Sequence, residues 1–244
     1  MSGHSKWSQI KHKKALTDAK KSKIFGKIAK LITIATREKG GNPETNSGLR
    51  LAIDKARSMN MTADNIERAI KRGTGEIEGV RMEEILYEAY GPGGIALIIE
   101  GITDNKNRTL SETRHILSQN NSKLAENGSV IWLFDKRFLL EIKLTDNNSK
   151  TKEDLELIAI ESGAEDFNWL ENNSLKIFAS PDKLDEIKDN LEKQNIIIDS
   201  STLEWIPKNP LPINDQKVKE QINKVFEALD EHDDINEIYS NLKE

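Results

Sequence analysis

The spacing of hydrophobic residues divides the chain into a helical N-terminal part and a mixed remainder. From Asp18 to Lys39 the apolar residues recur at intervals of three and four, as on one face of a helix, and Gly40-Gly41 ends it. A second helix begins at Asn46 or Ser47, and a third follows the N-cap Thr62 and closes at Gly73. Three short helices of this kind predict a small bundle that ends near residue 75.

The periodicity then changes to that of strands. RMEEILYEAY and IALIIEGIT are strand-like and are joined by the hairpin connection Gly91-Pro92-Gly93-Gly94. Residues 107–120 have a helical face, and SVIWLF is expected to be another strand. This segment therefore predicts a ββαβ unit.

Residues 135–206 show a second alternation of strands and helices. Strands are expected at FLLEIKL, DFNWL, SLKIFAS and IIIDSSTLEWI, and helices at 152–162 and 182–193. The order βαββαβ is that of the split-βαβ, ferredoxin-like pattern.

A boundary follows at IPKNPLPI, which holds three of the six prolines. The helix expected at 215–230 and the strand DINEIYS cannot bury themselves alone, so they most economically complete the ββαβ unit. The sequence thus predicts an α+β protein with an N-terminal three-helix domain and two α+β (ferredoxin-like) domains, one inserted in the other. The expected domains are 1–78, 79–134 with 207–244, and the insertion 135–206.

Charge is distributed unevenly over these domains. The 244-residue chain has a net charge of −5, yet residues 1–78 carry 17 Lys and Arg against 8 Asp and Glu. The remainder holds 19 of the 36 basic residues and 33 of the 41 acidic ones. A basic end on an otherwise acidic chain indicates a polyanionic partner at that end. The alternative is a disordered basic arm that only aids solubility.

The N-terminal domain supplies the candidate nucleic-acid-binding residues. Trp7 lies among cations in the first segment, a mixture that suits unpaired or irregular nucleic acid, in which bases stack on aromatic rings. On the first helix a lysine stripe flanks the apolar face and is expected to present its amines outward, toward phosphates. The stripe consists of Lys20, Lys23, Lys27 and Lys30. The alternative is a solvated lysine face with Trp7 as a hydrophobic anchor. The candidates are His4, Lys6, Trp7, Lys11, His12, Lys13, Lys14, Lys20, Lys21, Lys23, Lys27, Lys30, Arg68, Lys71 and Arg72.

The second and third helices also invite a helix-turn-helix interpretation, with ADNIERAIKR as recognition helix. Arg68, Lys71 and Arg72 share one face of this helix. Asp64 and Glu67 lie nearby and weaken the case for a helix that reads a groove, so phosphate contact is the simpler role. A capped surface helix of mixed charge explains the same residues.

No residue pattern indicates catalysis or a bound cofactor. The chain has no cysteine, its four histidines are scattered without metal-ligand spacing, and neither glycine-rich turn has phosphate-loop spacing. We therefore expect a non-enzyme without metal or cofactor. In the polar segment Thr103–Thr109, Asn107 or Thr109 is a candidate helix cap; alternatively Asn105, Asn107 and Arg108 line an interaction surface.

Five stretches together carry a family pattern: GHSKWSQIKHKKALTDAKKSKIFGKI, LRLAIDKARSMNMTADNIERAIKRGTG, YEAYGPGGIALIIEGITDNKNRTLSETRH, GSVIWLF and DDINEIYSN. With them the chain resembles the YebC/PmpR family of gene-expression regulators along essentially its whole length. The GHSKW start and the NIERAIKRGTG stretch are the most specific parts, whereas residues 135–206 match only loosely.

The resemblance implies a three-domain protein and two classes of function. Bacterial members resemble DNA-binding transcriptional regulators. Mitochondrial relatives are translational activators, and the family is also linked to ribosomes and to relief of stalling at proline-rich stretches. The first hypothesis is thus a transcriptional regulator, and the alternative is a ribosome-associated factor that binds ribosomal or transfer RNA. The lysine-rich start with Trp7 favours RNA, whereas the family's usual description favours DNA.

The remaining expectations concern location and assembly. No apolar run approaches the roughly 18 residues that a membrane span needs. Eukaryotic members of the family carry a presequence ahead of the GHSKW block. Here Met1 stands two residues before the glycine, so the chain resembles a bacterial, cytoplasmic protein. A monomer is expected, because no heptad seam or large apolar stripe demands a partner chain.

Overall fold

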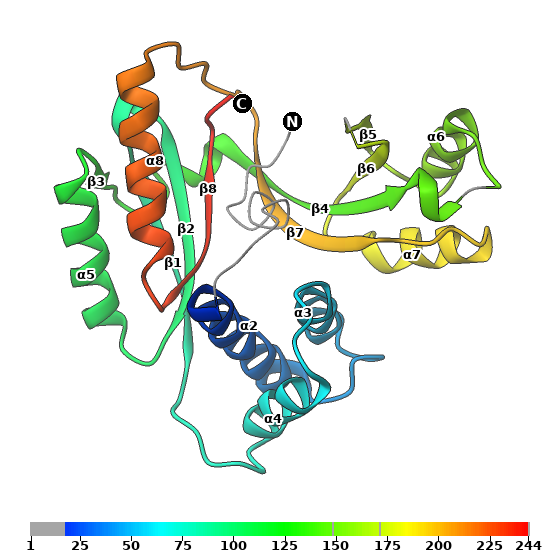
Figure 1. Cartoon of the computed structure of the whole chain (residues 1–244), viewed down its shortest axis with the longest axis horizontal. Helices are drawn as coiled ribbons and strands as arrows, with labels where there is room; N and C mark the ends of the chain where they lie inside the picture. Colours follow the sequence, from blue (N-terminus) through cyan, green and yellow to red (C-terminus); the bar gives the residue numbers. More distant parts are fainter. Residues whose placement is uncertain (1–17, 148, 171, 244) are drawn as a thin grey trace. The chain divides into compact units, whose positions relative to one another are not determined.

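The chain forms two compact units in the computed structural model, which describes residues 18–147, 149–170 and 172–243 (Figure 1). One unit is residues 135–206, and the other is the rest of the described chain, up to Phe134 and from Pro207 onward. Helices and two four-stranded sheets make up the fold. The predicted α+β class is confirmed. We keep the division into three domains as a proposal, because the helical bundle belongs to the same compact unit as the first sheet.

Three helices make up the N-terminal bundle: α2 (Asp18–Lys39), α3 (Ser47–Ser58) and α4 (Ala63–Thr74). Their apolar faces meet in one cluster that includes Ile28, Ile32 and Leu49. Asn46 joins two of the helices, because its side chain accepts from the Leu49 N–H at 3.0 Å and donates to the carbonyl of Ala35 at 2.7 Å. The three expected helices are thus present, and the structure shows Asn46 as the N-cap of the second.

Gly73 does not close the third helix, contrary to expectation. The helix continues to Thr74, and Gly75 ends it in the left-handed conformation, with φ of 84°. Gly73 lies where α4 crosses α2: a Cβ there would come within 2.5 Å of the Thr36 Cβ and 2.6 Å of the Thr33 carbonyl oxygen. Close helix packing therefore explains this glycine.

The first sheet has the strand order β3-β1-β2-β8, with β3 (Lys123–Leu124) at its edge, and is built from both ends of its unit. The hairpin strands β1 (Glu83–Tyr90) and β2 (Ala96–Thr103) pair antiparallel, and β8 (Ile235–Ser240) pairs with β2. The helices α5 (Lys106–Gln119) and α8 (Gln216–Asp230) lie beside the sheet (Figure 1). They share its hydrophobic core, which includes Leu97, Ile99, Leu117 and Phe226.

The prediction of a strand at SVIWLF was wrong. The edge strand is instead the two-residue β3 (Lys123–Leu124), and Ile131–Leu133 form a 3-10 turn. The buried carboxylate of Glu88 on β1 accepts from the backbone N–H groups of Gly128 and Val130, each at 2.5 Å, and of Ile131 at 2.8 Å. Because one side chain satisfies these three amides, the segment has no need of a strand partner.

Residues 135–206 form the second sheet, of order β5-β6-β4-β7. The elements are β4 (Phe134–Lys143), α6 (Lys152–Glu161), β5 (Asp166–Trp169), β6 (Ser174–Ala179), α7 (Leu184–Lys193) and β7 (Ser200–Pro207). This is the βαββαβ order that the sequence predicts. The last strand starts four residues later than expected, because the Ile197 N–H donates to the Asn147 side chain at 2.9 Å rather than to a neighbouring strand.

In the three described ranges, no helix combines the length and the apolar character that crossing a membrane requires.

Candidate nucleic-acid interface

Three lysines of the α2 stripe lie against the loop that joins α8 to β8. The Lys27 amine donates to the Asp230 carbonyl at 2.6 Å and lies 3.6 Å from the Asp230 carboxylate. Lys23 lies 3.2 Å from the carboxylate of Asp233 and also donates to the backbone of this loop. Lys30 donates to the Asp233 carbonyl at 3.0 Å. The acidic loop therefore receives the amines of the stripe.

This placement contradicts the expectation that the whole stripe presents its amines outward. Lys27 is only 9% exposed, and burial lowers the pKa of its amine, an effect that the nearby Asp230 carboxylate opposes. Lys23 and Lys30 are half-buried. The physical reason is that a carboxylate-rich loop, more than 200 residues away in sequence, supplies partners that the local pattern did not reveal.

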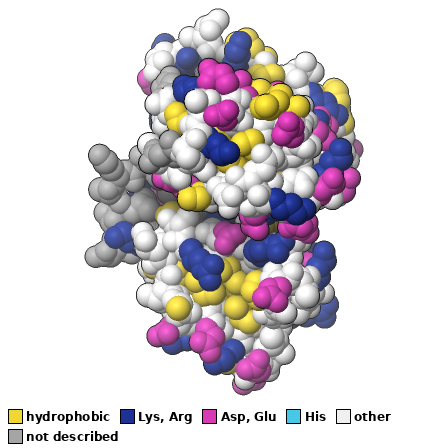
Figure 2. Space-filling model, turned by 90° about the vertical axis from the view of Figure 1, so that its right-hand side faces the viewer, with side chains coloured by type: hydrophobic (Ala, Val, Ile, Leu, Met, Phe, Trp, Pro, Cys, Tyr) yellow, Lys and Arg dark blue, Asp and Glu magenta, His cyan; other side chains and the backbone are white. Residues whose placement is uncertain are grey.

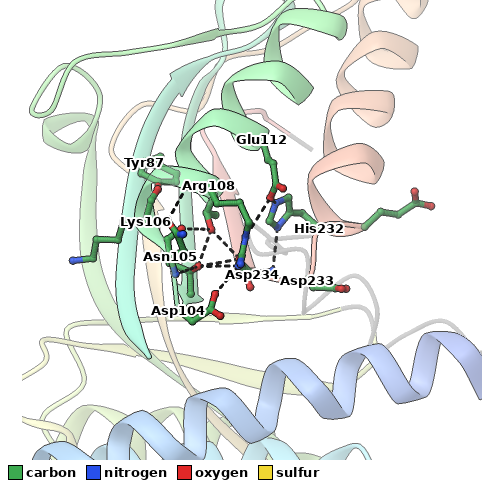
Figure 3. A network of polar contacts seen from close by, with 12 residues as sticks. Tyr87, Asp104, Asn105, Lys106, Arg108, Glu112, His232, Asp233 and Asp234 are labelled. Carbon is green, nitrogen blue, oxygen red and sulfur yellow. Dashed lines mark hydrogen bonds and ion pairs between the residues drawn. The ribbon is translucent and has the colours of Figure 1, made fainter. Parts of the chain in front are cut away.

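Asp234 is the centre of the polar cluster in Figure 3. Its Oδ1 accepts from Lys30 at 2.7 Å, and its Oδ2 accepts from Arg108 at 2.8 Å. Two buried hydroxyls also donate to Oδ2, Thr109 at 2.8 Å and Thr103 at 3.0 Å. Burial opposes the charge, but the hydrogen bonds from Lys30, Arg108 and Thr109 outweigh it and hold the pKa of Asp234 well below its ordinary value. The cluster joins α2, the start of α5 and the α8–β8 loop.

The polar segment before α5 serves this cluster. Asn105 is the N-cap of α5, since its side chain accepts from the Arg108 N–H at 3.1 Å; the expectation that Asn107 or Thr109 is the cap was wrong. Arg108 also pairs with Asp104 at 2.7 Å. Asn107 is exposed. An interaction surface at Asn105, Asn107 and Arg108 stays a prediction.

His232 and Lys55 make further contacts that hold this loop and the strand β8 that follows it. His232 accepts the Asp234 N–H on its Nδ1 at 3.0 Å, so its Nε2, 2.8 Å from a carboxylate oxygen of Glu112 on α5, carries the proton (Figure 3). On α3, Lys55 pairs with Glu237 of β8. The loop and the strand that follows are thus fixed to α2, α3 and α5 by charged side chains.

Asp234 and Thr103 were not predicted as members of this cluster. The run Glu231-His232-Asp233-Asp234 was available as a signal, since its charge complements the lysine stripe. A charge match alone does not pair two segments so far apart in the chain, so this signal was insufficient. The close approach of Gly101 to the loop was equally hidden: a Cβ at Gly101 would lie 2.1 Å from the Asp234 carbonyl oxygen.

Other candidate cations lie at the surface. Lys20 and Lys21 at the start of α2, and Arg68 and Arg72 on α4, are exposed, and none of them forms an ion pair with another described residue. Lys71 is bound to Glu67 one turn earlier, at 2.6 Å. The remaining candidates, His4, Lys6, Trp7, Lys11, His12, Lys13 and Lys14, lie outside the described residues.

The surface charge is mixed where it can be seen. On the face drawn in Figure 2, Lys and Arg side chains alternate with Asp and Glu, and no large area has a single sign. Within the described ranges, no group of three or more His, Cys, Asp or Glu side chains is placed to hold a metal ion.

Two family models match nearly the whole chain. The TACO1/YebC protein N-terminal domain matches residues 5–76, and the TACO1/YebC second and third domain matches residues 82–242. The chain belongs to the TACO1/YebC family. This agrees with the resemblance that the sequence motifs indicate, and it assigns the basic helical part to the family's N-terminal domain.

Individual members of the TACO1/YebC family are similar over their full length. A protein of Halothermothrix orenii is 48% identical over 242 residues, which cover 99% of this chain and 95% of that protein. One from Thermotoga maritima is 46% identical over 243 residues and covers 100% and 94%. Both bear the name "Probable transcriptional regulatory protein". The crystal structure of a conserved hypothetical protein from Aquifex aeolicus, 41% identical, superimposes with a TM-score of 0.84 over 97% of this chain and 96% of its own.

Proposed function

We propose that the protein is a non-enzymatic regulator of gene expression that binds nucleic acid through its N-terminal helical domain. The observation that carries this proposal is the group of exposed cations on α2 and α4, Lys20, Lys21, Arg68 and Arg72, in the part of the chain with the excess of positive charge. The names of the relatives support regulation of transcription as its setting. The proposal includes a cytoplasmic monomer.

The arrangement of basic and acidic side chains on α2 and α4 favours contact with phosphates over the reading of base edges. Lysine and arginine at the helix surface are suited to phosphate oxygens. On α4 the acidic Asp64 and Glu67 are exposed beside the basic residues, and Glu67 holds Lys71. Such a helix would be repelled in part by the backbone that lines a groove. The acidic remainder of the chain limits unspecific adsorption to other polyanions.

The test removes four charges and measures affinity against salt. In the variant K20Q/K21Q/R68Q/R72Q, binding to a labelled oligonucleotide should weaken, and the slope of log affinity against log salt should become less negative by about 3 to 4. The matched control is K217Q/K219Q/K224Q/K243Q, which removes four exposed lysines from the same compact unit and reaches the same net charge. An equal loss in both variants, or a wild-type affinity that does not respond to salt, would refute the proposal.

A ribosome-associated translation factor is the second candidate. The mixed charge of α4 favours it, because irregular RNA offers phosphates and unpaired bases without requiring a helix to enter a groove. Sedimentation of native extract on a sucrose gradient, with and without RNase, separates the two. Co-migration with ribosomes that RNase abolishes would support the RNA role. A protein that stays in the free pool and binds a defined promoter duplex would support the transcriptional role.

A further inference from the structure

Two exposed aromatic rings converge on one backbone carbonyl, far in sequence from the basic helices. The Tyr90 hydroxyl donates to the Ser129 carbonyl at 3.1 Å, and the Trp132 indole N–H donates to the same oxygen at 3.0 Å. Tyr90 is 42% exposed and Trp132 63%. The polar edges of both rings are thus fixed to the protein, while much of their remaining surface is open to solvent.

The carbonyl that holds the rings is itself rigidly placed. Glu88, on the same strand as Tyr90, is almost fully buried and accepts the N–H groups of Gly128, Val130 and Ile131. Ser129 lies in the middle of this bound segment, and its own N–H donates to the Glu126 carbonyl at 3.1 Å. Tyr90 at the end of β1 and Trp132 in this loop are therefore both held in place by the protein and need little ordering when a ligand arrives.

The surroundings of the pair suit a small flat ligand with negative charge. Lys123 of β3 is directly opposite Tyr90 in the antiparallel register, so both side chains lie on the same face of the sheet, and Lys123 is exposed. Over the described residues 81–134 and 207–243, Tyr90 and Trp132 are the only exposed large hydrophobic side chains. A docking surface for a protein is normally a larger apolar patch.

We propose that Tyr90 and Trp132 form a stacking site for an unpaired nucleobase, with Lys123 beside it to contact the adjacent phosphate. Aromatic rings next to a cation are the combination that binds single-stranded nucleic acid with little sequence preference. This inference rests on the proposed nucleic-acid function and adds to it a preference for unpaired over duplex strands. It also places a second contact outside the helical domain.

The experiment compares one single-stranded oligonucleotide with its duplex. Both are fluorescently labelled, and binding to the full chain is followed by anisotropy. W132A should bind the single strand about 5- to 150-fold more weakly, the usual range for loss of one stacked base, and should bind the duplex as the wild type does. W132F keeps a ring at this position and should recover most of the affinity. V80A, which shortens another highly exposed hydrophobic side chain, is the control.

The outcomes separate this inference from the proposed function. If W132A binds the single strand like the wild type while K20Q/K21Q/R68Q/R72Q does not, the stacking site is refuted and the nucleic-acid function stands. An equal loss for single strand and duplex would also refute a site for unpaired bases. If the wild type binds neither oligonucleotide, the nucleic-acid function fails, and the stacking site fails with it. Circular dichroism of W132A and W132F verifies that both variants are folded.

Discussion

Replacing Asp234 by asparagine tests whether the α8–β8 loop is held to the rest of its unit by charge. The carboxylate is buried and accepts four hydrogen bonds, from Lys30, Arg108, Thr103 and Thr109. Asparagine has nearly the same shape, so D234N changes the charge and the acceptor capacity without leaving a cavity. Any loss of stability then reports on the electrostatic contacts.

The expected loss of stability in D234N follows from the partners of the two carboxylate oxygens of Asp234. If the asparagine oxygen takes the place of Oδ2, the contacts with Arg108 and both threonines remain. The amide nitrogen then takes the place of Oδ1, 2.7 Å from the Lys30 amine, and no hydrogen bond forms there because both groups are donors. The opposite orientation sacrifices three contacts, so the first is preferred. It loses one hydrogen bond between charged groups and weakens the Arg108 contact, which together should lower the free energy of unfolding by about 2–4 kcal/mol.

The stabilising effect of Asp234 should decrease at low pH. The pKa of Asp234 is lower in the folded state than in the unfolded state. The carboxylate therefore contributes fully to the free energy of unfolding above the ordinary aspartate pKa of about 3.9, and this contribution is lost as the pH falls toward the folded-state pKa. Urea unfolding followed by far-ultraviolet circular dichroism should show a constant difference in the free energy of unfolding between wild type and D234N from about pH 5 to 7. Below about pH 4 the gap should narrow, by at most about 1.4 kcal/mol per pH unit.

D233N is the matched control for D234N. It removes the neighbouring carboxylate, whose side chain is 81% exposed and pairs with Lys23 at the surface. Such a pair should contribute less than about 1 kcal/mol. Equal destabilisation by D233N and D234N, or a D234N gap that does not change below pH 4, would show that the cluster does not stabilise the unit as argued.

Two further substitutions test the packing and the buried acceptor of the same unit. G101A should lower the free energy of unfolding by about 1–3 kcal/mol, because its Cβ would lie 2.1 Å from the Asp234 carbonyl oxygen. The control G26A on α2, where nothing lies within 4 Å, should leave stability unchanged or raise it. Equal effects of G101A and G26A on stability would contradict this packing argument. In E88Q the side-chain amide cannot accept hydrogen bonds from all three loop N–H groups. Hydrogen exchange should therefore quicken at Gly128, Val130 or Ile131, and the free energy of unfolding should fall by about 1–3 kcal/mol. Unchanged exchange at all three positions would show that the Glu88 carboxylate does not hold the loop.

Much of the fold could be predicted because its signals are local. The start of α3 follows from Asn46, whose side chain caps an amide three residues away, and the end of α2 follows from Gly40 with its positive φ. The βαββαβ order of residues 135–206 follows from strand and helix periods that each span a few residues. Even Gly73, which the sequence analysis assigned to the wrong role, was recognised as a position that requires glycine.

The candidate site could be predicted only in part. The sequence indicates correctly that Lys20, Lys21, Arg68 and Arg72 are surface cations, because their helical faces follow from the apolar period. It does not indicate where a long side chain finds its partner. Lys27 carries the same local signature as Lys20, yet its amine is bound to a residue 203 positions away.

The sequence alone therefore determined most of the helices and strands, their order, and the concentration of positive charge in residues 1–78. The tertiary structure decided which of those charges are used internally, and it turned the expected strand at SVIWLF into a loop bound by Glu88. The physical reason is the range of the interactions. Periodicity, caps and turns act over a few residues and leave a pattern in the sequence, whereas a buried carboxylate takes whichever donors the folded chain brings within hydrogen-bonding distance.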